Sequence, residues 1–252
     1  MKRVLFLLLV LFPMSIMAIE NDELYIDELE TSIMFLSNDV VRVKENYKLD
    51  IIYSSNPSIY YFNRNIGTDF EFKYGKTYKY KVESKLLDYK GRNFVYNDEN
   101  GLKVKYGYEN IHLDPNYKYY LEYDAILKDK ETGFNIYYIG GFDYDVRKIK
   151  FNVSLPYLND DTKVILFSMD GKKFKEKLDN LETEVKSSTL LTGEYYTTLK
   201  KGEKLYILTY DKDKVEVENE TIFKIDTKLI IIISIIVVCI ISLVILIKRK
   251  NH

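Results

Sequence analysis

Residues 132–156 read TGFNIYYIGGFDYDVRKIKFNVSLP, and the spacing of apolar residues in this stretch decides the fold class. Two runs rich in apolar and aromatic residues flank the pair Gly140 and Gly141. The second run alternates apolar and polar residues until Pro156, with apolar side chains at Ile149, Phe151, Val153 and Leu155. Such alternation is typical of a strand with one buried face. The stretch therefore predicts a strand, a tight glycine turn and a second strand, and no helix follows the glycines to hold a phosphate.

The same alternation recurs along most of the chain. Between residues 41 and 53 the odd positions are apolar, with the single exception of Glu45. Turn residues at 37–39 predict a hairpin between this strand and a preceding one near residues 31–36. Further alternating runs occupy residues 78–84, 102–108, 117–125, 163–167, 194–198 and 205–210. Many short strands without a sustained helical period indicate an all-β protein, and we expect a β-sandwich.

The segment 156–161 contains a proline, an asparagine and two aspartates, and it predicts an internal boundary. We therefore expect a main β-sandwich domain over residues 19–156. A smaller β subdomain would occupy residues 157–219. A short polar stalk at residues 220–228 would follow it.

The N-terminus has the pattern of a secretory signal peptide over residues 1–18. Lys2 and Arg3 precede an apolar run, and the segment ends at the small residue Ala18. A short basic region, an apolar core and a small residue at the cut are the three parts of such a signal. The alternative is a signal anchor that is not cleaved. Either form predicts export.

Residues 229–247 form an apolar run without a charge. Nineteen residues in a helix rise about 1.5 Å each, which nearly covers the ~30 Å hydrocarbon core of a bilayer. Basic residues at 248–250 outnumber the single Lys228 on the other side, so the tail at residues 248–252 should stay in the cytoplasm. The sequence predicts a single-pass type I protein of the cytoplasmic (inner) membrane, with most of the chain on the extracytoplasmic side.

The composition of the predicted exported region, about 209 residues, narrows its function. Its formal net charge is about −7, and basic and acidic residues are interleaved. A nucleic-acid-binding protein would show a basic stripe, and none is present. The single cysteine, Cys239, lies in the apolar C-terminal run, so the exported region has no disulfide.

The run IYYIGGFDYDVRKIKFNVSLP resembles the signature of a bacterial family of predicted membrane proteins known as domain of unknown function 2207. Its members carry an aromatic pair, a glycine, an Asp-aromatic-Asp-Val run and a strand that ends in Leu-Pro. The matching positions are Tyr137, Tyr138, Gly141, Asp143, Tyr144, Asp145, Val146, Leu155 and Pro156. The resemblance implies an N-terminal extracytoplasmic β domain, here in a short form that lacks the family's longer C-terminal part. It implies no activity and no catalytic residue.

Two upstream stretches extend the resemblance. VRVKENYKLDIIYS, from Val41, is similar to the family's strand with a Val-Thr-Glu motif, and it places Glu45 at the glutamate. IYYFNRNIG, from Ile59, is similar to a Tyr-Arg-Asp-Ile-Pro motif, and it places Arg64 at the arginine. Asn65 stands where the family has an aspartate.

No known catalytic set is apparent. Ser-His or Cys-His catalysis needs a histidine beside a nucleophile, and the exported region holds only His112 and no cysteine. The sequence contains no nucleotide-binding loop and no metalloprotease motif. We therefore expect no cofactor, no metal and no catalytic residue. Two uses of the carboxylates stay open: a glycosidase-like pair, and a calcium site formed by Asp143 and Asp145 with residues 160–161.

Glu45 is the one charge on an apolar strand face and therefore needs a partner. A lone carboxylate in a core is strongly disfavoured unless it is paired or protonated. Arg64 is our candidate, because a guanidinium can hold a carboxylate with two parallel hydrogen bonds. The alternative is that Glu45 and Arg64 line a ligand site. We also expect Tyr137, Tyr144, Phe151 and Val153 to be buried.

The sequence favours a non-catalytic binding module of the bacterial cell envelope. Its partner would be another envelope protein or a surface polymer. The alternative is a carboxylate-based hydrolase that acts on envelope glycans.

Overall fold

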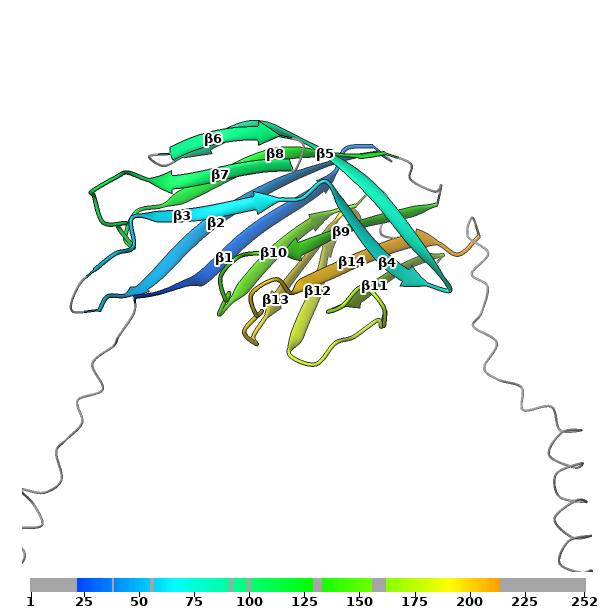
Figure 1. Cartoon of the computed structure of the whole chain (residues 1–252). Coiled ribbons are helices and arrows are strands. Elements are labelled where there is room, and N and C mark those ends of the chain that lie inside the picture. Colours follow the sequence, from blue (N-terminus) through cyan, green and yellow to red (C-terminus); the bar gives the residue numbers. More distant parts are fainter. Residues whose placement is uncertain are drawn as a thin grey trace, which may run out of the picture. The chain divides into compact units, whose positions relative to one another are not determined.

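The computed structural model describes residues 22–37, 39–54, 57–90, 93–98, 101–128, 133–155 and 162–213 (Figure 1). In these residues the regular structure consists of β-strands in several sheets, which confirms the all-β prediction. No helix in this part of the chain has the length and apolar character needed to cross a membrane. The predicted signal peptide, stalk, membrane span and cytoplasmic tail lie outside the described residues.

The largest sheet has eight strands. In sheet order they are β12 (Leu181–Ser187), β13 (Leu190–Tyr195), β10 (Ile149–Ser154), β1 (Glu23–Phe35), β2 (Val40–Ile52), β8 (Tyr119–Lys128), β5 (Lys76–Lys90) and β4 (Asp69–Tyr74). One small sheet contains β11 (Lys163–Ser168), β14 (Lys204–Asp211) and β9 (Phe134–Gly140), and the other contains β3 (Tyr61–Ile66), β7 (Gly101–Gly107) and β6 (Asn93–Asp98). Neighbouring strands are antiparallel except β1 and β10, which are parallel. The hairpin expected around residues 37–39 is confirmed, because β1 pairs with β2.

Alternation places one face of the large sheet in the core. A row of directly opposed residues runs across five strands of that face, from Gly193 through Phe151, Thr31 and Glu45 to Leu121. All four of these residues with side chains are almost completely buried.

The two small sheets cover this face through aromatic contacts. Tyr47 of β2 packs edge-on against Phe62 of β3, with ring centroids 5.0 Å apart. Phe70 of β4 packs in the same way against Tyr138 of β9, at 5.4 Å. The hydrophobic core therefore lies between the large sheet and the small ones, and aromatic rings make up much of it.

The stretch 132–156 does not form the tight turn that the sequence predicted. β9 belongs to a small sheet and β10 to the large one, so residues 141–148 cross between sheets (Figure 1). Gly140 and Gly141 have φ angles of 124° and 67°, and a Cβ on Gly140 would lie 2.3 Å from the Glu203 carbonyl oxygen. The glycines therefore permit a close passage past another loop. The prediction failed because alternation identifies a strand without identifying its neighbour.

The predicted boundary at residues 156–161 also needs correction. β12 and β13, which follow it, extend the large sheet beyond β10. β11 and β14, which also follow it, form a sheet with β9. Strands on both sides of the boundary thus share two sheets, and the strands within 157–219 form no separate subdomain.

Candidate functional site

Glu45 and Arg64 meet in the core between β2 and β3. The Arg64 Nε donates a hydrogen bond to Glu45 Oε2 at 2.9 Å, and Arg64 Nη2 donates one to Oε1 at 2.8 Å. Each side chain is 2% exposed. This is the two-bond geometry in which a guanidinium grips a carboxylate most strongly. The structure therefore gives the buried carboxylate the partner that the sequence suggested.

Other polar and aromatic groups surround this pair. The Tyr47 hydroxyl donates to Glu45 Oε2, and Arg64 Nη1 donates to the Asn65 carbonyl at 3.1 Å. The Phe142 ring centroid lies 4.2 Å from the guanidinium carbon. Burial opposes the charge on Arg64, but the Glu45 carboxylate outweighs it and holds the pKa of Arg64 above its usual value. Burial, reinforced by Glu45, raises the pKa of Tyr47 well above its usual value.

The geometry of the pair favours a structural role. Its hydrogen bonds join the large sheet to the sheet of β3, and neither residue lines the surface hollows described below. A ligand would need access to atoms that the core covers. We therefore treat Glu45 and Arg64 as a buried clamp between sheets, which stays a hypothesis until it is tested by mutation.

The aspartates of the family-like signature have separate partners. Asp143 accepts a hydrogen bond from Asn65 Nδ2 at 2.7 Å. Asp145 accepts bonds from Lys200 Nζ at 2.8 Å and from the Lys201 amide at 2.9 Å, and Lys200 lowers the pKa of Asp145. The two carboxylates therefore bind different partners. Within the described residues no three His, Cys, Asp or Glu side chains are grouped to hold a metal, and residues 160–161 lie outside that part.

The apolar and aromatic residues that were expected to be buried around the signature lie in the core, with one exception. Tyr137, Phe151 and Val153 are buried, as expected. Tyr144 is only half-buried, so the expectation that it would be buried in the core needs correction. Its hydroxyl accepts a hydrogen bond from the Asn63 amide at 3.2 Å. The remaining signature residues Tyr138, Val146 and Leu155 are buried, Gly141 lies in the crossing segment, and Pro156 is outside the described residues.

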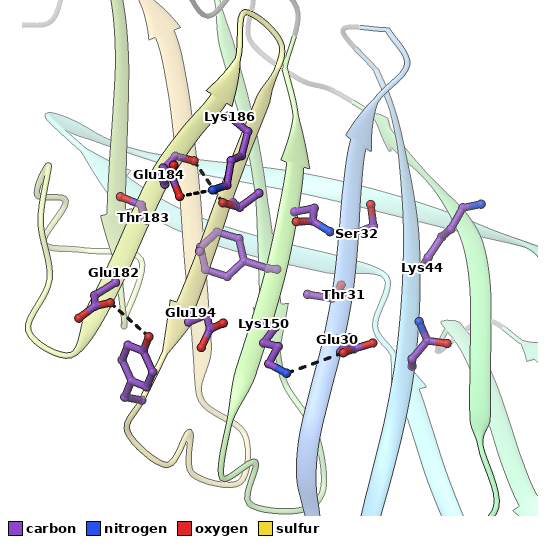
Figure 2. A pocket seen from close by; sticks show the side chains of 16 residues that line it. Glu30, Thr31, Ser32, Lys44, Lys150, Glu182, Thr183, Glu184, Lys186 and Glu194 are labelled. Carbon is purple, nitrogen blue, oxygen red and sulfur yellow. Dashed lines mark hydrogen bonds and ion pairs between the residues drawn. The ribbon is translucent and has the colours of Figure 1, made fainter.

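A groove of about 610 Å³ runs along strands β12, β13, β10, β1 and β2. Figure 2 shows side chains from these neighbouring strands gathered along it. Most of them are the polar residues that alternate with the core residues. Its lining consists of Glu30, Thr31, Ser32, Lys44, Asn46, Lys150, Phe151, Asn152, Glu182, Thr183, Glu184, Lys186, Thr192, Gly193, Glu194 and Tyr196. We refer to it as the polar groove.

The lysines of the polar groove are already close to carboxylates. Lys150 Nζ lies 3.1 Å from Glu28 Oε2 and 3.9 Å from Glu30 Oε1. Lys44 Nζ lies 3.1 Å from Glu122 Oε1. Lys186 contacts Glu184 within the same strand (Figure 2). The four glutamates and three lysines of the lining therefore give a nearly neutral surface.

No feature of the sequence predicted the polar groove. Its residues occupy the alternate positions that the strand pattern assigns to the solvent side, and such residues normally need no further explanation. Only the pairing of β10 with β1 and β13 brings them together. The sequence of a polar strand face does not show which other strands will lie beside it.

A second, more apolar hollow of about 270 Å³ lies beside residues 107–119. Tyr108, Ile111 and Tyr117 line it and are exposed. His112 also lines it, and its ring stacks on Tyr60 with centroids 4.9 Å apart. Among the described residues, the contacts of His112 are therefore with aromatic rings, and none of them is with a nucleophile.

Comparisons of the sequence with protein-family models and with curated proteins found no matching family and no relative. The resemblance to domain of unknown function 2207 therefore stays a prediction from the signature residues.

Proposed function

We propose that the protein is a non-catalytic binding module of the bacterial cell envelope. In this proposal a β-sandwich domain is exported and residues 229–247 anchor it in the inner membrane. The observation that carries the proposal is the polar groove, a hollow of about 610 Å³ formed by side chains from five adjacent strands. Strands provide a rigid support for such a surface, and an extended partner could contact several of them at once. The partner would be a surface polymer or another envelope protein.

Site-specific crosslinking tests this function. A photoreactive amino acid at Asn152, in the polar groove, should capture a partner when the full-length protein is in its native membrane. The same amino acid at Lys79, an exposed residue of β5, is the matched control and should capture much less. Electrophoresis and mass spectrometry of the adducts give the measurement. Equal capture at both positions would contradict a binding role for the groove.

The proposed topology has its own test. In spheroplasts, external protease should digest the β domain and leave a fragment that contains residues 229–252. The reason is that a type I orientation exposes everything before the span. Immunoblotting with a C-terminal epitope tag measures the fragment, and detergent lysis controls for protease access. Protection of the β domain in intact spheroplasts would rule out this orientation.

A carboxylate-based glycan hydrolase is the second candidate, and one observation favours it. Glu182 and Glu194 are direct cross-strand neighbours that both line the polar groove. Glycosidases use such carboxyl pairs as acid and base or nucleophile. Here Glu182 accepts a hydrogen bond from the Tyr196 hydroxyl at 3.2 Å, and Glu194 lies 3.4 Å from Lys148 Nζ. Glycan cleavage that is lost in Glu194→Gln would favour this candidate over the binding module.

A further inference from the structure

We propose that the ligand of the polar groove is a neutral oligosaccharide, an inference that rests on the proposed binding function. Three features of the groove support it: its paired charges, a row of uncharged polar side chains, and an exposed tyrosine ring.

The charges of the groove do not favour a strongly charged polymer. Lys150 and Lys44 each lie 3.1 Å from a carboxylate, so a polyanion would have to compete with glutamates for them. A polycation would meet the same lysines. Charged partners are normally matched by a surface dominated by the opposite sign. The nearly neutral lining therefore favours a ligand without net charge.

Uncharged polar residues form a row across the strands at the middle of the groove. Thr192, Asn152 and Ser32 are directly opposed on β13, β10 and β1. The Asn152 and Ser32 side chains have no hydrogen-bond partner within the described part of the chain. An amide offers two donors and an acceptor site, and a hydroxyl offers both functions. The row can therefore bind groups that donate and accept, as sugar hydroxyls do.

The spacing of this row also suits a sugar chain. Adjacent strands lie about 4.8 Å apart, which is comparable with the length of one sugar unit in an extended glycan. A chain that crosses the strands could thus place one unit over each of β13, β10 and β1. Repeated contacts of this kind would give affinity without any single strong site.

Tyr196 supplies an apolar surface to the same groove. Its side chain is 51% exposed, and its hydroxyl donates to Glu182 Oε2 at 3.2 Å, which restrains the ring. Sugar rings have an apolar C–H face beside their hydroxyl edges, and an aromatic ring can pack against that face. A mostly polar site with one aromatic surface therefore fits a saccharide better than an apolar peptide.

The experiment uses the full-length protein in detergent and a panel of neutral hexasaccharides: chitohexaose, cellohexaose and maltohexaose. We expect at least one to bind in isothermal titration calorimetry. Tyr196→Ala and Asn152→Ala should each weaken that binding about tenfold or more, because each removes a contact of the order of a hydrogen bond or ring stack. Tyr108→Ala, which changes an exposed tyrosine beside the apolar hollow, is the matched control and should leave it unchanged.

Salt dependence separates the ligand classes. Binding of the neutral hexasaccharide should change less than about twofold between about 50 mM and about 500 mM NaCl, because screening acts on charges. Binding of poly(glycerol phosphate) that is stronger than any hexasaccharide and falls steeply with salt would overturn the inference. Failure of all three hexasaccharides to bind would also overturn it.

If Asn152 still crosslinks a partner in membranes, only the ligand class is wrong. If Asn152 captures nothing, the proposed function fails as well.

Discussion

Arg64→Met should lower the free energy of unfolding by about 3–5 kcal/mol, more than the simultaneous replacement of Arg64 and Glu45. The single substitution leaves the Glu45 carboxylate in the core, where it is 2% exposed, and among the described residues only the Tyr47 hydroxyl still donates a hydrogen bond to it. An unpaired buried charge is costly because the solvation that it loses is not replaced. Glu45→Leu should be costly for the converse reason, since it leaves a buried guanidinium without its carboxylate.

The double variant Glu45→Leu, Arg64→Met removes both charges and keeps apolar volume at both positions. Replacing a buried ion pair with apolar residues is often close to neutral, so we expect strong non-additivity in a double-mutant cycle. Urea denaturation of the full-length protein in detergent, followed by near-UV circular dichroism of its tyrosines, provides the four free energies. If the two single losses simply add, Glu45 and Arg64 do not support each other.

A surface ion pair provides the matched control for this cycle. Lys48 Nζ lies 2.6 Å from Asp27 Oδ2, a closer approach than in the buried pair. However, the Lys48 side chain is 68% exposed, so water can replace the partner. Lys48→Met should therefore change the free energy of unfolding far less than Arg64→Met does. The contrast isolates burial, rather than distance, as the source of the effect at Arg64.

The clamp could be predicted from the sequence because Glu45 interrupts a regular alternation of apolar residues. Between residues 41 and 53 every odd position is apolar except Glu45, and a buried carboxylate requires a partner. The strands themselves could also be predicted, since alternation is a local property. Their neighbours could not, because hydrogen bonding between strands depends on contacts between distant residues. The parallel pairing of β1 with β10 is the clearest case, and it also builds the polar groove.

Phe151→Ala should lower the free energy of unfolding by about 3–5 kcal/mol. Phe151 is 2% exposed and lies in the same cross-strand row as Glu45, with Thr31 between them. On its other side, Gly193 of β13 faces it directly. The large cost follows from the loss of buried ring contacts and from the cavity that remains. Urea denaturation, as for Arg64, gives the measurement.

The absence of a side chain at Gly193 is what makes room for this ring. A Cβ at Gly193 would lie 2.2 Å from Phe151 Cζ, which is far inside normal contact. Gly193→Ala should therefore cost about 1–3 kcal/mol, because the ring has to move within a packed core. Gly67 is the matched control, since the nearest atom to a Cβ there is 4.0 Å away, and Gly67→Ala should change stability by less than about 0.5 kcal/mol.

Combining the two changes tests whether the ring is the cause. In a Phe151→Leu background the atom that blocks a Cβ is gone, so Gly193→Ala should cost much less than it does beside phenylalanine. The free energies of unfolding of the four proteins decide the question. An equal cost of Gly193→Ala in both backgrounds would mean that the strand needs glycine for a reason other than the ring. In that case the packing of β13 against β10 would have to be explained through the backbone rather than through Phe151.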